Sequence, residues 1–346
     1  MKSTEFRKLS VASGGLWKRK DPQPVPLETV DAVIFDVDGV LVEVSGSFRH
    51  VISQSVQFYF NRILEVPGEE RLVSGEETGL FKLAGNFNND WDVTKGAVAY
   101  GLMKLMNLDG VSDKNIEHLR KKTPALEEFT EEIKNRGGGL RVTLEIIREK
   151  LGKQDFSRFT SLYRPDLIRQ LFLEHYAGSG LCRALYGFDP RYAEGPGLIE
   201  RERDIVDVPL LRKTAANGIA LGILSGRIPS EAEYLFRKNG MDSLLNPDFV
   251  VTDDGSLPSK PDPAGLSLLA RKMGFQAAIY VGDVPDDWTT VSAYNSQSRN
   301  TAPIACCMVQ TGAVSDKLIS LFYEESGVDY VAADVNCLLK ALLLHR

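Results

Sequence analysis

The sequence predicts an α/β protein in which a mostly helical domain interrupts a parallel-sheet core. Strand-like and helix-like segments alternate from about residue 219 to the end of the chain, as in a doubly wound parallel sheet. A further strand is predicted much earlier, over residues 32–38, whose β-branched and aromatic run suits burial on both faces. Only helical periodicity is found between these regions. The helical domain is therefore expected to be inserted after the first strand of one α/β domain.

The elements of the core follow from short apolar runs and from helix boundary residues. Pro229 begins a helical pattern that Gly240 follows, and Gly274 closes another helix in the same way. Strands are expected over residues 32–38, 219–225, 248–252, 278–283, 303–309 and 330–333. Helices are expected over residues 229–239, 263–273, 286–294, 315–323 and 336–345.

The insert shows helical periodicity and no alternation typical of strands. Helices are expected over residues 48–63, 93–106, 113–119, 126–135, 142–151 and 165–176. The predicted domains are a flexible basic tail (1–30), a discontinuous α/β core (31–43 and 207–346) and a helical cap domain (44–206).

Length and composition exclude several classes of protein. The 346 residues are enough for about two domains at roughly 100–200 residues each. With 43% hydrophobic residues, the chain is neither disordered, nor collagen-like, nor a small disulfide scaffold. A net charge of −6 argues against a nucleic-acid partner. No segment approaches the roughly 18 apolar residues of a membrane helix, so no membrane partner is expected.

The N-terminal segment differs from the rest in charge. Residues 1–30 hold six basic and three acidic side chains, a balance of +3, and lack the apolar core of a secretory signal. A solvated tail is the preferred interpretation, and an organelle transit peptide, such as a plastid one, stays open. The four cysteines include no C-x-x-C pair, which fits a reducing, cytoplasmic compartment. They are Cys182, Cys306, Cys307 and Cys337.

Polar residues stand at the ends of the predicted core strands. Because the carboxyl ends of parallel strands meet at one edge of a sheet, these side chains are expected to share a crevice. They are Asp36 and Asp38 after the first strand, Ser225 and Gly226 after the second, Lys260 in the loop after the third, and Asp283 and Asp287 after the fourth.

These residue types together suit displacement at phosphorus. One of the two first aspartates can act as nucleophile and the other as general acid and base. Asp283 and Asp287 add hard oxygen ligands, which favour Mg²⁺ over zinc. Lys260 and Ser225 can hold phosphate oxygens, helped by backbone N–H groups in the strand-end turns. The implied reaction forms an aspartyl-phosphate that water then hydrolyses.

With these four motifs in chain order, the sequence resembles the haloacid dehalogenase superfamily of phosphohydrolases, in the branch with a helical cap after the first strand. The resemblance covers about residue 31 to the C-terminus, and it implies a Rossmann-like core with an inserted cap. It implies that Asp36 is the nucleophile, that Asp38 protonates the leaving group and activates water, and that Ser225, Gly226 and Lys260 bind phosphate. The remaining implication is a metal site. Mg²⁺ would be held by Asp36, the backbone carbonyl of Asp38, and Asp283, with Asp287 in support rather than its neighbour Asp286.

Each motif alone has an ordinary structural interpretation, as a turn, a loop lysine or a helix N-cap. Their joint occurrence at successive strand ends favours catalysis. Asp38 argues against the dehalogenase branch, which lacks this second acid. A phosphomutase and a non-catalytic protein that retains the fold are the alternatives to a phosphatase.

The insert is where substrate selection is expected. Arg49 follows the first strand closely, and Asn88 and Trp91 lie in a segment rich in amide and carboxylate groups, which suits a polyol or amino substrate. The alternatives are a surface charge for Arg49, and a loop ending in a helix N-cap with Trp91 packed into the domain. The expected partner is a small phosphorylated metabolite, either a sugar phosphate, a phosphoglycolate-like acid or an amino-alcohol phosphate. The chain is expected to be a monomer or homodimer.

Overall fold

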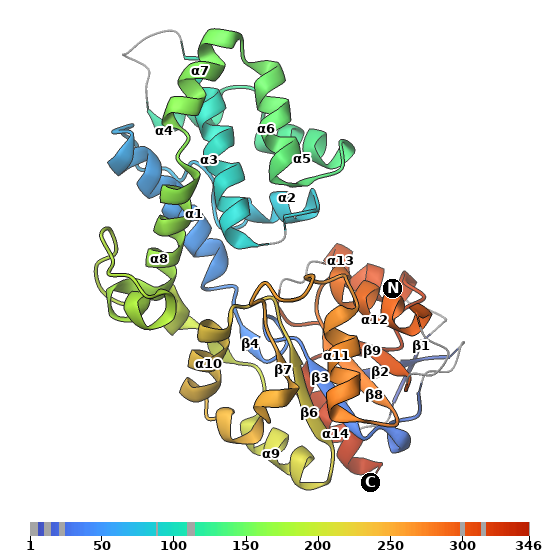
Figure 1. The fold of residues 1–346 in the computed structure, drawn as a ribbon. Helices are drawn as coiled ribbons and strands as arrows, with labels where there is room; N and C mark the ends of the chain where they lie inside the picture. Colours follow the sequence, from blue (N-terminus) through green and yellow to red (C-terminus); the bar gives the residue numbers. More distant parts are fainter. Residues whose placement is uncertain are drawn as a thin grey trace. The chain divides into compact units, whose positions relative to one another are not determined.

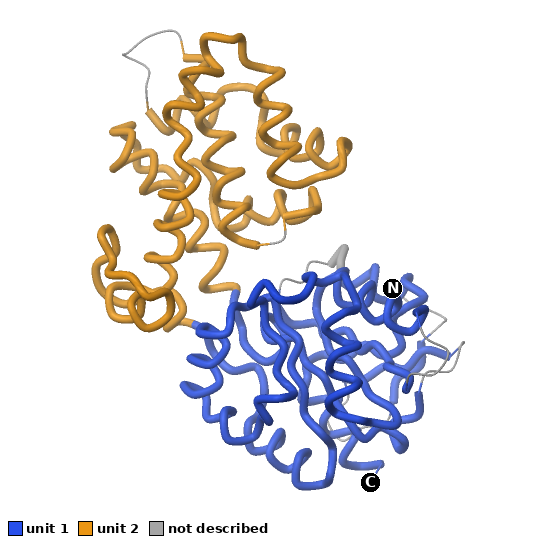
Figure 2. The backbone as a smooth tube through the Cα atoms, in the orientation of Figure 1, with its two compact units in different colours: residues 1–44, 202–346 blue, residues 45–201 orange. Residues whose placement is uncertain are grey.

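The chain folds into two compact units, one of which is built from both ends of the sequence. The computed structural model describes residues 6–9, 15–20, 25–87, 89–108, 115–297, 302–312 and 316–345. Residues 1–44 and 202–346 form the first unit, and residues 45–201 form the second (Figure 2). The sequence places the insert at 44–206, and the second unit begins one residue later and ends five residues earlier.

An eight-stranded, mostly parallel sheet forms the centre of the first unit (Figure 1). Its strand order is β1-β2-β10-β9-β8-β3-β6-β7. Parallel pairing joins β10 to β9, β9 to β8, β8 to β3, β3 to β6 and β6 to β7. The strands are β1 (Phe6–Lys8), β2 (Leu16–Arg19), β3 (Ala32–Phe35), β6 (Ala220–Leu224), β7 (Val250–Val251), β8 (Ala278–Gly282), β9 (Ile304–Val309) and β10 (Tyr330–Ala332). The α/β fold class predicted from the sequence is confirmed.

Helices pack against the sheet as the alternating pattern predicts. Apolar residues of α11, α12 and α13 share one core with residues of β3, β8 and β9, while α14 contacts α9, β2 and β10. These helices are α9 (Val208–Ala216), α10 (Pro229–Lys238), α11 (Ala264–Met273), α12 (Pro285–Gln297), α13 (Asp316–Glu324) and α14 (Val335–Leu344). Two short strands, β4 (Val42–Glu43) and β5 (Arg203–Asp204), pair antiparallel where the chain leaves and re-enters this unit.

The N-terminal segment is the main correction to the sequence prediction. Residues 1–30 were expected to be a solvated tail, but β1 and β2 add to the sheet edge: β2 pairs antiparallel with β10, and β1 pairs antiparallel with β2. Phe6 and Leu16 are buried, and so is Arg19, which donates from Nε to the Val328 carbonyl at 2.6 Å. The guanidinium of Arg19 also lies 4.6 Å from the centre of the Phe6 ring. The sequence did not indicate these strands because they are only three and four residues long. Their basic residues also suggested exposure to solvent, although one of them, Arg19, is buried.

The second unit is built from helices, with α3 at its centre. Most of the α3 side chains from Val93 onward are buried, and α3 packs against α1, α6, α7 and α8. The helices are α1 (Phe48–Phe58), α2 (Thr78–Leu83), α3 (Asp90–Met106), α4 (Ile116–Lys121), α5 (Leu126–Asn135), α6 (Gly139–Lys150), α7 (Lys153–Leu162) and α8 (Pro165–Tyr186). In neither unit does a described helix have the length and apolar character needed to cross a bilayer.

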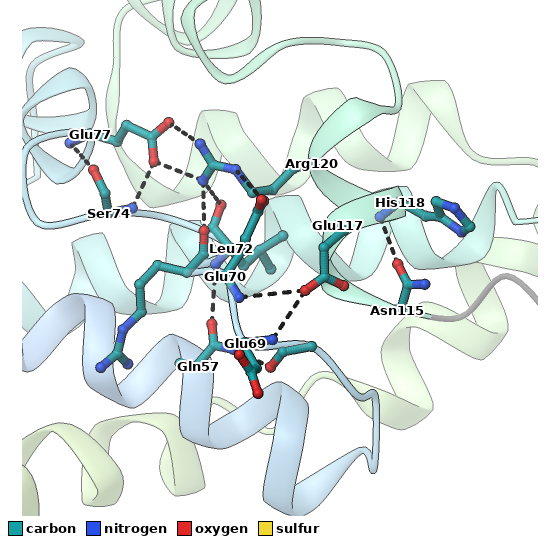
Figure 3. A network of polar contacts seen from close by, with 12 residues as sticks. Gln57, Glu69, Glu70, Leu72, Ser74, Glu77, Asn115, Glu117, His118 and Arg120 are labelled. Atoms are coloured by element: carbon teal, nitrogen blue, oxygen red, sulfur yellow. Dashed lines mark hydrogen bonds and ion pairs between the residues drawn. The ribbon is translucent and has the colours of Figure 1, made fainter.

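A polar network fastens the long loop between α1 and α2 in this second unit (Figure 3). Arg120 of α4 donates to both carboxylate oxygens of Glu77, at 2.9 and 3.0 Å, and to the Leu72 carbonyl at 3.0 Å. Glu77 in turn accepts the N–H of Ser74 at 2.7 Å. The planar guanidinium can make these bonds at once, so one side chain orders a segment with little regular secondary structure of its own.

His175 of α8 gives the second unit a specific pH dependence. Its Nδ1 lies 2.9 Å from Ser55 Oγ, and burial lowers its pKa to about 4, with the Glu174 charge opposing and the Arg71 charge adding to the shift. An unfolded histidine titrates near 6.5, so the unfolded chain binds the proton first as the pH falls. The free energy of unfolding should therefore drop between about pH 6.5 and pH 4, by about 2–3 kcal/mol from this residue.

Urea unfolding of the wild type and of His175→Gln at pH 7.5 and pH 4.5 measures this contribution. The variant should lose less stability on acidification than the wild type, because its side chain does not titrate. Identical losses in the two proteins would contradict the assignment.

Candidate active site

The sheet brings the sequence-predicted residues of the core to one edge. β3 pairs in parallel with both β6 and β8, so the residues that follow these three strands are neighbours. The ladder continues past the strand ends: the N–H of Asp36 donates to the Val281 carbonyl at 2.9 Å, and that of Ser225 to the Val251 carbonyl at 3.0 Å. The carboxyl ends of parallel strands are the common ligand-binding edge of such sheets.

Asp36 is buried directly after β3, with 6% of its surface exposed. Its Oδ1 accepts the N–H of Val37 at 2.8 Å, and its Oδ2 lies 3.0 Å from Lys260 Nζ. Burial raises the pKa of Asp36 to about 7, the Lys260 charge lowers it, and the nearby carboxylates raise it further. A second cation beside Asp36 would favour the ionised form that a nucleophile requires.

A tight turn after Asp36 places Asp38. Gly39 has a φ of +72° and donates its N–H to the Val42 carbonyl at 2.8 Å. A Cβ on Gly39 would lie 2.3 Å from Oδ2 of Asp283, so a larger residue would clash with that carboxylate as well as strain the backbone. The turn leaves the Asp38 side chain one-third exposed, beside the buried Asp36.

Lys260 joins two carboxylates and a phenol. Its Nζ lies 2.7 Å from Asp287 Oδ1 and 3.2 Å from the Tyr280 hydroxyl, in addition to Asp36. Burial alone would lower the pKa of Lys260, but the carboxylates of Asp287 and Asp36 raise it well above its usual value. Lys260 therefore remains positively charged and fixed within the site.

Asp287 is fully buried, whereas its neighbour Asp286 is exposed. Oδ1 of Asp287 accepts from Lys260 and from the Tyr280 hydroxyl (2.8 Å), and Oδ2 accepts the N–H groups of Asp283 (2.9 Å) and Val284 (3.1 Å). These four bonds fill the acceptor positions of one carboxylate. Asp287 thus holds Lys260 and the backbone at Asp283 in place.

Three carboxylates form a group that could hold a cation. Oxygen atoms of Asp36, Asp283 and Asp287 all lie within 4.8 Å of one another, and all three residues are buried. Lys260 compensates only part of their negative charge when all are ionised. An all-carboxylate donor set is typical of Mg²⁺ rather than zinc. The side chain of Asp38 is not part of this group.

Ser225 and Gly226 follow β6 as predicted. Ser225 is buried and its Oγ accepts the N–H of Arg227 at 3.2 Å. Gly226 is exposed, with open space where a Cβ would stand. Ser225, Gly226 and Lys260 all line a cavity of about 30 Å³. The predicted phosphate-binding residues therefore share one small hollow.

Several residues at this edge escaped the sequence prediction. Tyr280 lies inside an apolar strand, where a tyrosine is usually only a packing residue. Thr311 follows β9, and its Oγ1 donates to the Gly39 carbonyl at 2.6 Å. Gly312 is so near Asp283 that a Cβ there would lie 2.4 Å from Oδ2. The sequence predicted the strand β9, so the position of Thr311 and Gly312 just after its end was the signal that could have placed them at the site.

The three residues proposed for substrate selection belong to the second unit or lie outside the described residues. Arg49 is partly buried in the first turn of α1. Trp91 is partly buried in α3, its ring 6.2 Å from that of Phe172 and 5.1 Å from the guanidinium of Arg169. Asn88 is outside the described residues. Asn89 accepts the Asp92 N–H at 2.9 Å and caps α3, so both features of the structural alternative, an N-cap and a packed Trp91, are present.

Comparisons with known proteins identify the family of the chain. The model of the haloacid dehalogenase-like hydrolase family matches residues 30–290. The chain is 26% identical to the solved phosphatase Tt82 from Thermococcus thioreducens, with a TM-score of 0.55. The match covers 85% of this chain and 99% of that one. A structure described as a candidate phosphoglycolate phosphatase from Lactobacillus delbrueckii subsp. bulgaricus is 14% identical, with a TM-score of 0.50 over 91% of this chain and 98% of that one. At that identity the second likeness shows the fold alone.

One curated relative is named as a dehydratase rather than a phosphatase. An imidazoleglycerol-phosphate dehydratase from Phytophthora nicotianae is 24% identical over 260 residues, which are 75% of this chain and 40% of the relative. The chain thus spans well under half of that protein's length.

The chain belongs to the haloacid dehalogenase-like hydrolases, because the family model covers three quarters of it. The family and the solved phosphatase neighbour support a phosphatase, an enzyme that hydrolyses phosphoric monoesters.

Proposed function

We propose that this protein is a Mg²⁺-dependent phosphatase that hydrolyses a small phosphorylated metabolite through an aspartyl-phosphate on Asp36. The observation that carries the proposal is the position of Asp36. It is buried at the end of β3, it lies 3.0 Å from Lys260 Nζ, and it belongs to a cluster of three carboxylates. A carboxylate held in this way is a pre-oriented nucleophile for a phosphoryl group.

The chemistry assigned to the residues is a double displacement. A carboxylate oxygen of Asp36 attacks phosphorus, the bond from phosphorus to the substrate oxygen breaks, and Asp38 gives that oxygen a proton. Asp38 then takes a proton from water, the water oxygen attacks phosphorus, and the bond to Asp36 breaks to release inorganic phosphate. Lys260, Ser225 and the N–H of Gly226 would hold the phosphate oxygens, which are the atoms that bear the developing charge.

The residues present fit Mg²⁺. Asp36 and Asp283 would bind the ion directly together with the Asp38 carbonyl, while Asp287 supports them, because its acceptor positions are already used within the protein. When bound, Mg²⁺ neutralises charge on the carboxylates and on the phosphate.

Phosphate release from a panel of phosphometabolites is the direct test. The wild type should release phosphate with Mg²⁺ and lose at least about 100-fold of that rate in EDTA, with recovery when Mg²⁺ is restored. Metal-independent release would contradict the cofactor assignment. An isomerised phosphosugar without free phosphate would instead indicate a phosphomutase, and no turnover of any substrate would favour a non-catalytic protein.

The same panel tests the substrate pocket proposed for the second unit. Trp91→Ala and Asn88→Ala are expected to change the ranking of sugar, acid and amino-alcohol phosphates. An unchanged ranking in folded variants would mean that substrate selection does not depend on these residues.

A further inference from the structure

A buried arginine connects the second acid of the site to the returning chain. Arg227 follows β6 and only 1% of its side chain is exposed. Its Nε donates to Asp38 Oδ1 at 2.6 Å, and a terminal nitrogen lies 2.5 Å from the same oxygen. That nitrogen also lies 2.9 Å from Oε2 of Glu202, whose side chain is fully buried.

We propose that Arg227, supported by Glu202, is a positioning residue that orients Asp38 for proton transfer to the leaving group. This inference rests on the proposed phosphatase function. Asp38 stands in a turn and its side chain is one-third exposed, so the turn by itself leaves the carboxylate able to rotate. The planar guanidinium, by contrast, fixes the direction of the bonds that it makes.

Hydrogen bonds hold both the backbone and the guanidinium of Arg227. Its N–H donates to Ser225 Oγ at 3.2 Å, and its carbonyl accepts the N–H of Asp253 at 2.8 Å. Glu202 lies just before β5, which pairs with β4 beyond the Asp38 turn. Because the backbone and the guanidinium are both held, Arg227 can impose one orientation on Asp38.

The geometry also distinguishes the two oxygens of Asp38. Both contacts from Arg227 end on Oδ1. Oδ2 is therefore the oxygen that can carry the proton toward a leaving group. If Arg227 only stabilised the fold, its replacement should lower kcat/KM equally for all classes of substrate.

The leaving group separates a positioning role from a structural one. A p-nitrophenolate ion leaves without being protonated, whereas the alkoxide of an alkyl phosphate needs the proton of Asp38. General acid catalysis contributes about 10²–10⁴-fold. The ratio kcat/KM reports the steps up to phosphoryl transfer to Asp36, so the effect should be read on that ratio rather than on kcat.

The experiment compares kcat/KM for p-nitrophenyl phosphate and for an alkyl phosphate that the wild type hydrolyses. Arg227→Met should lower the alkyl value by about 30-fold or more, and the p-nitrophenyl value by less than about threefold. Arg227→Lys should recover part of the loss, and Glu202→Gln should show the same preference with a smaller effect. Arg237→Met, at an exposed position of α10, is the matched control and should resemble the wild type.

Equal losses on the two substrates, or no loss, in folded variants would overturn the positioning role. Circular dichroism and thermal unfolding establish which variants fold, and Arg227→Lys or Glu202→Gln decides the matter if Arg227→Met does not. Failure of the proposed function can be distinguished from failure of this inference. A wild type without Asp36-dependent turnover would overturn the proposed function and this inference together, while an active wild type with leaving-group-independent variants would overturn the inference alone.

Discussion

Asp36→Asn is expected to abolish phosphate release, with kcat reduced at least about 10³-fold. The asparagine side chain has nearly the same shape and can still accept the Val37 N–H, but its amide is a poor nucleophile for phosphorus. It also removes one negative charge from the carboxylate group formed with Asp283 and Asp287. The variant should fold at least as well as the wild type, because a carboxylate whose pKa is raised by burial is replaced by a neutral group.

Steady-state phosphate release with Mg²⁺ measures this effect, and Asp286→Asn provides the matched control. Asp286 lies in the first turn of α12 and is exposed, so its replacement should change the rate by less than about threefold. Appreciable turnover by Asp36→Asn would exclude Asp36 as the nucleophile.

Lys260→Met is expected to damage both catalysis and stability. The ammonium group contacts Asp36 at 3.0 Å and Asp287 at 2.7 Å within the buried site. Its loss should lower kcat/KM by about 10²–10³-fold, the usual cost of removing a charge-stabilising donor. Removing one partner of a buried ion pair leaves uncompensated charge and typically costs about 3–5 kcal/mol of folding free energy.

The control for this variant is Lys272→Met in α11, where the lysine is 40% exposed and lies 3.6 Å from Asp248. That exposed pair should contribute less than about 1 kcal/mol. Urea unfolding and phosphate release should therefore both separate the two lysine variants. A Lys260→Met protein with wild-type activity would contradict the phosphate-binding role, and one with wild-type stability would contradict the argument from buried charge.

The central part of the fold and of the site was predictable because the signals are local. The first strand is an apolar run that ends in Asp36 and Asp38, and parallel pairing of β3 with β6 and β8 brings the later motif residues to the same edge. The resemblance to the haloacid dehalogenase family favoured Asp287 over Asp286, and Asp287 is the buried one of the two.

The remaining features depend on contacts between residues distant in sequence. Arg227 stands out from the sequence by no motif, because its partners, Asp38 and Glu202, lie 189 and 25 positions away. Tyr280 stands in an apolar strand, and only the fold brings its hydroxyl to Asp287, to which it donates. The strands β1 and β2 could not be inferred, since they join the sheet through β10, which pairs with β2 and lies near the other end of the chain. Local composition contains no information about such pairs.

Chemical trapping of the intermediate tests the central assignment most directly. The wild type would be mixed with substrate and Mg²⁺, quenched in acid, reduced with borohydride and digested for mass spectrometry. Reduction converts an aspartyl-phosphate to homoserine, so homoserine is expected at position 36. An enzyme that turns over under the same conditions without modification of Asp36, or with the modification at Asp38 instead, would contradict the account.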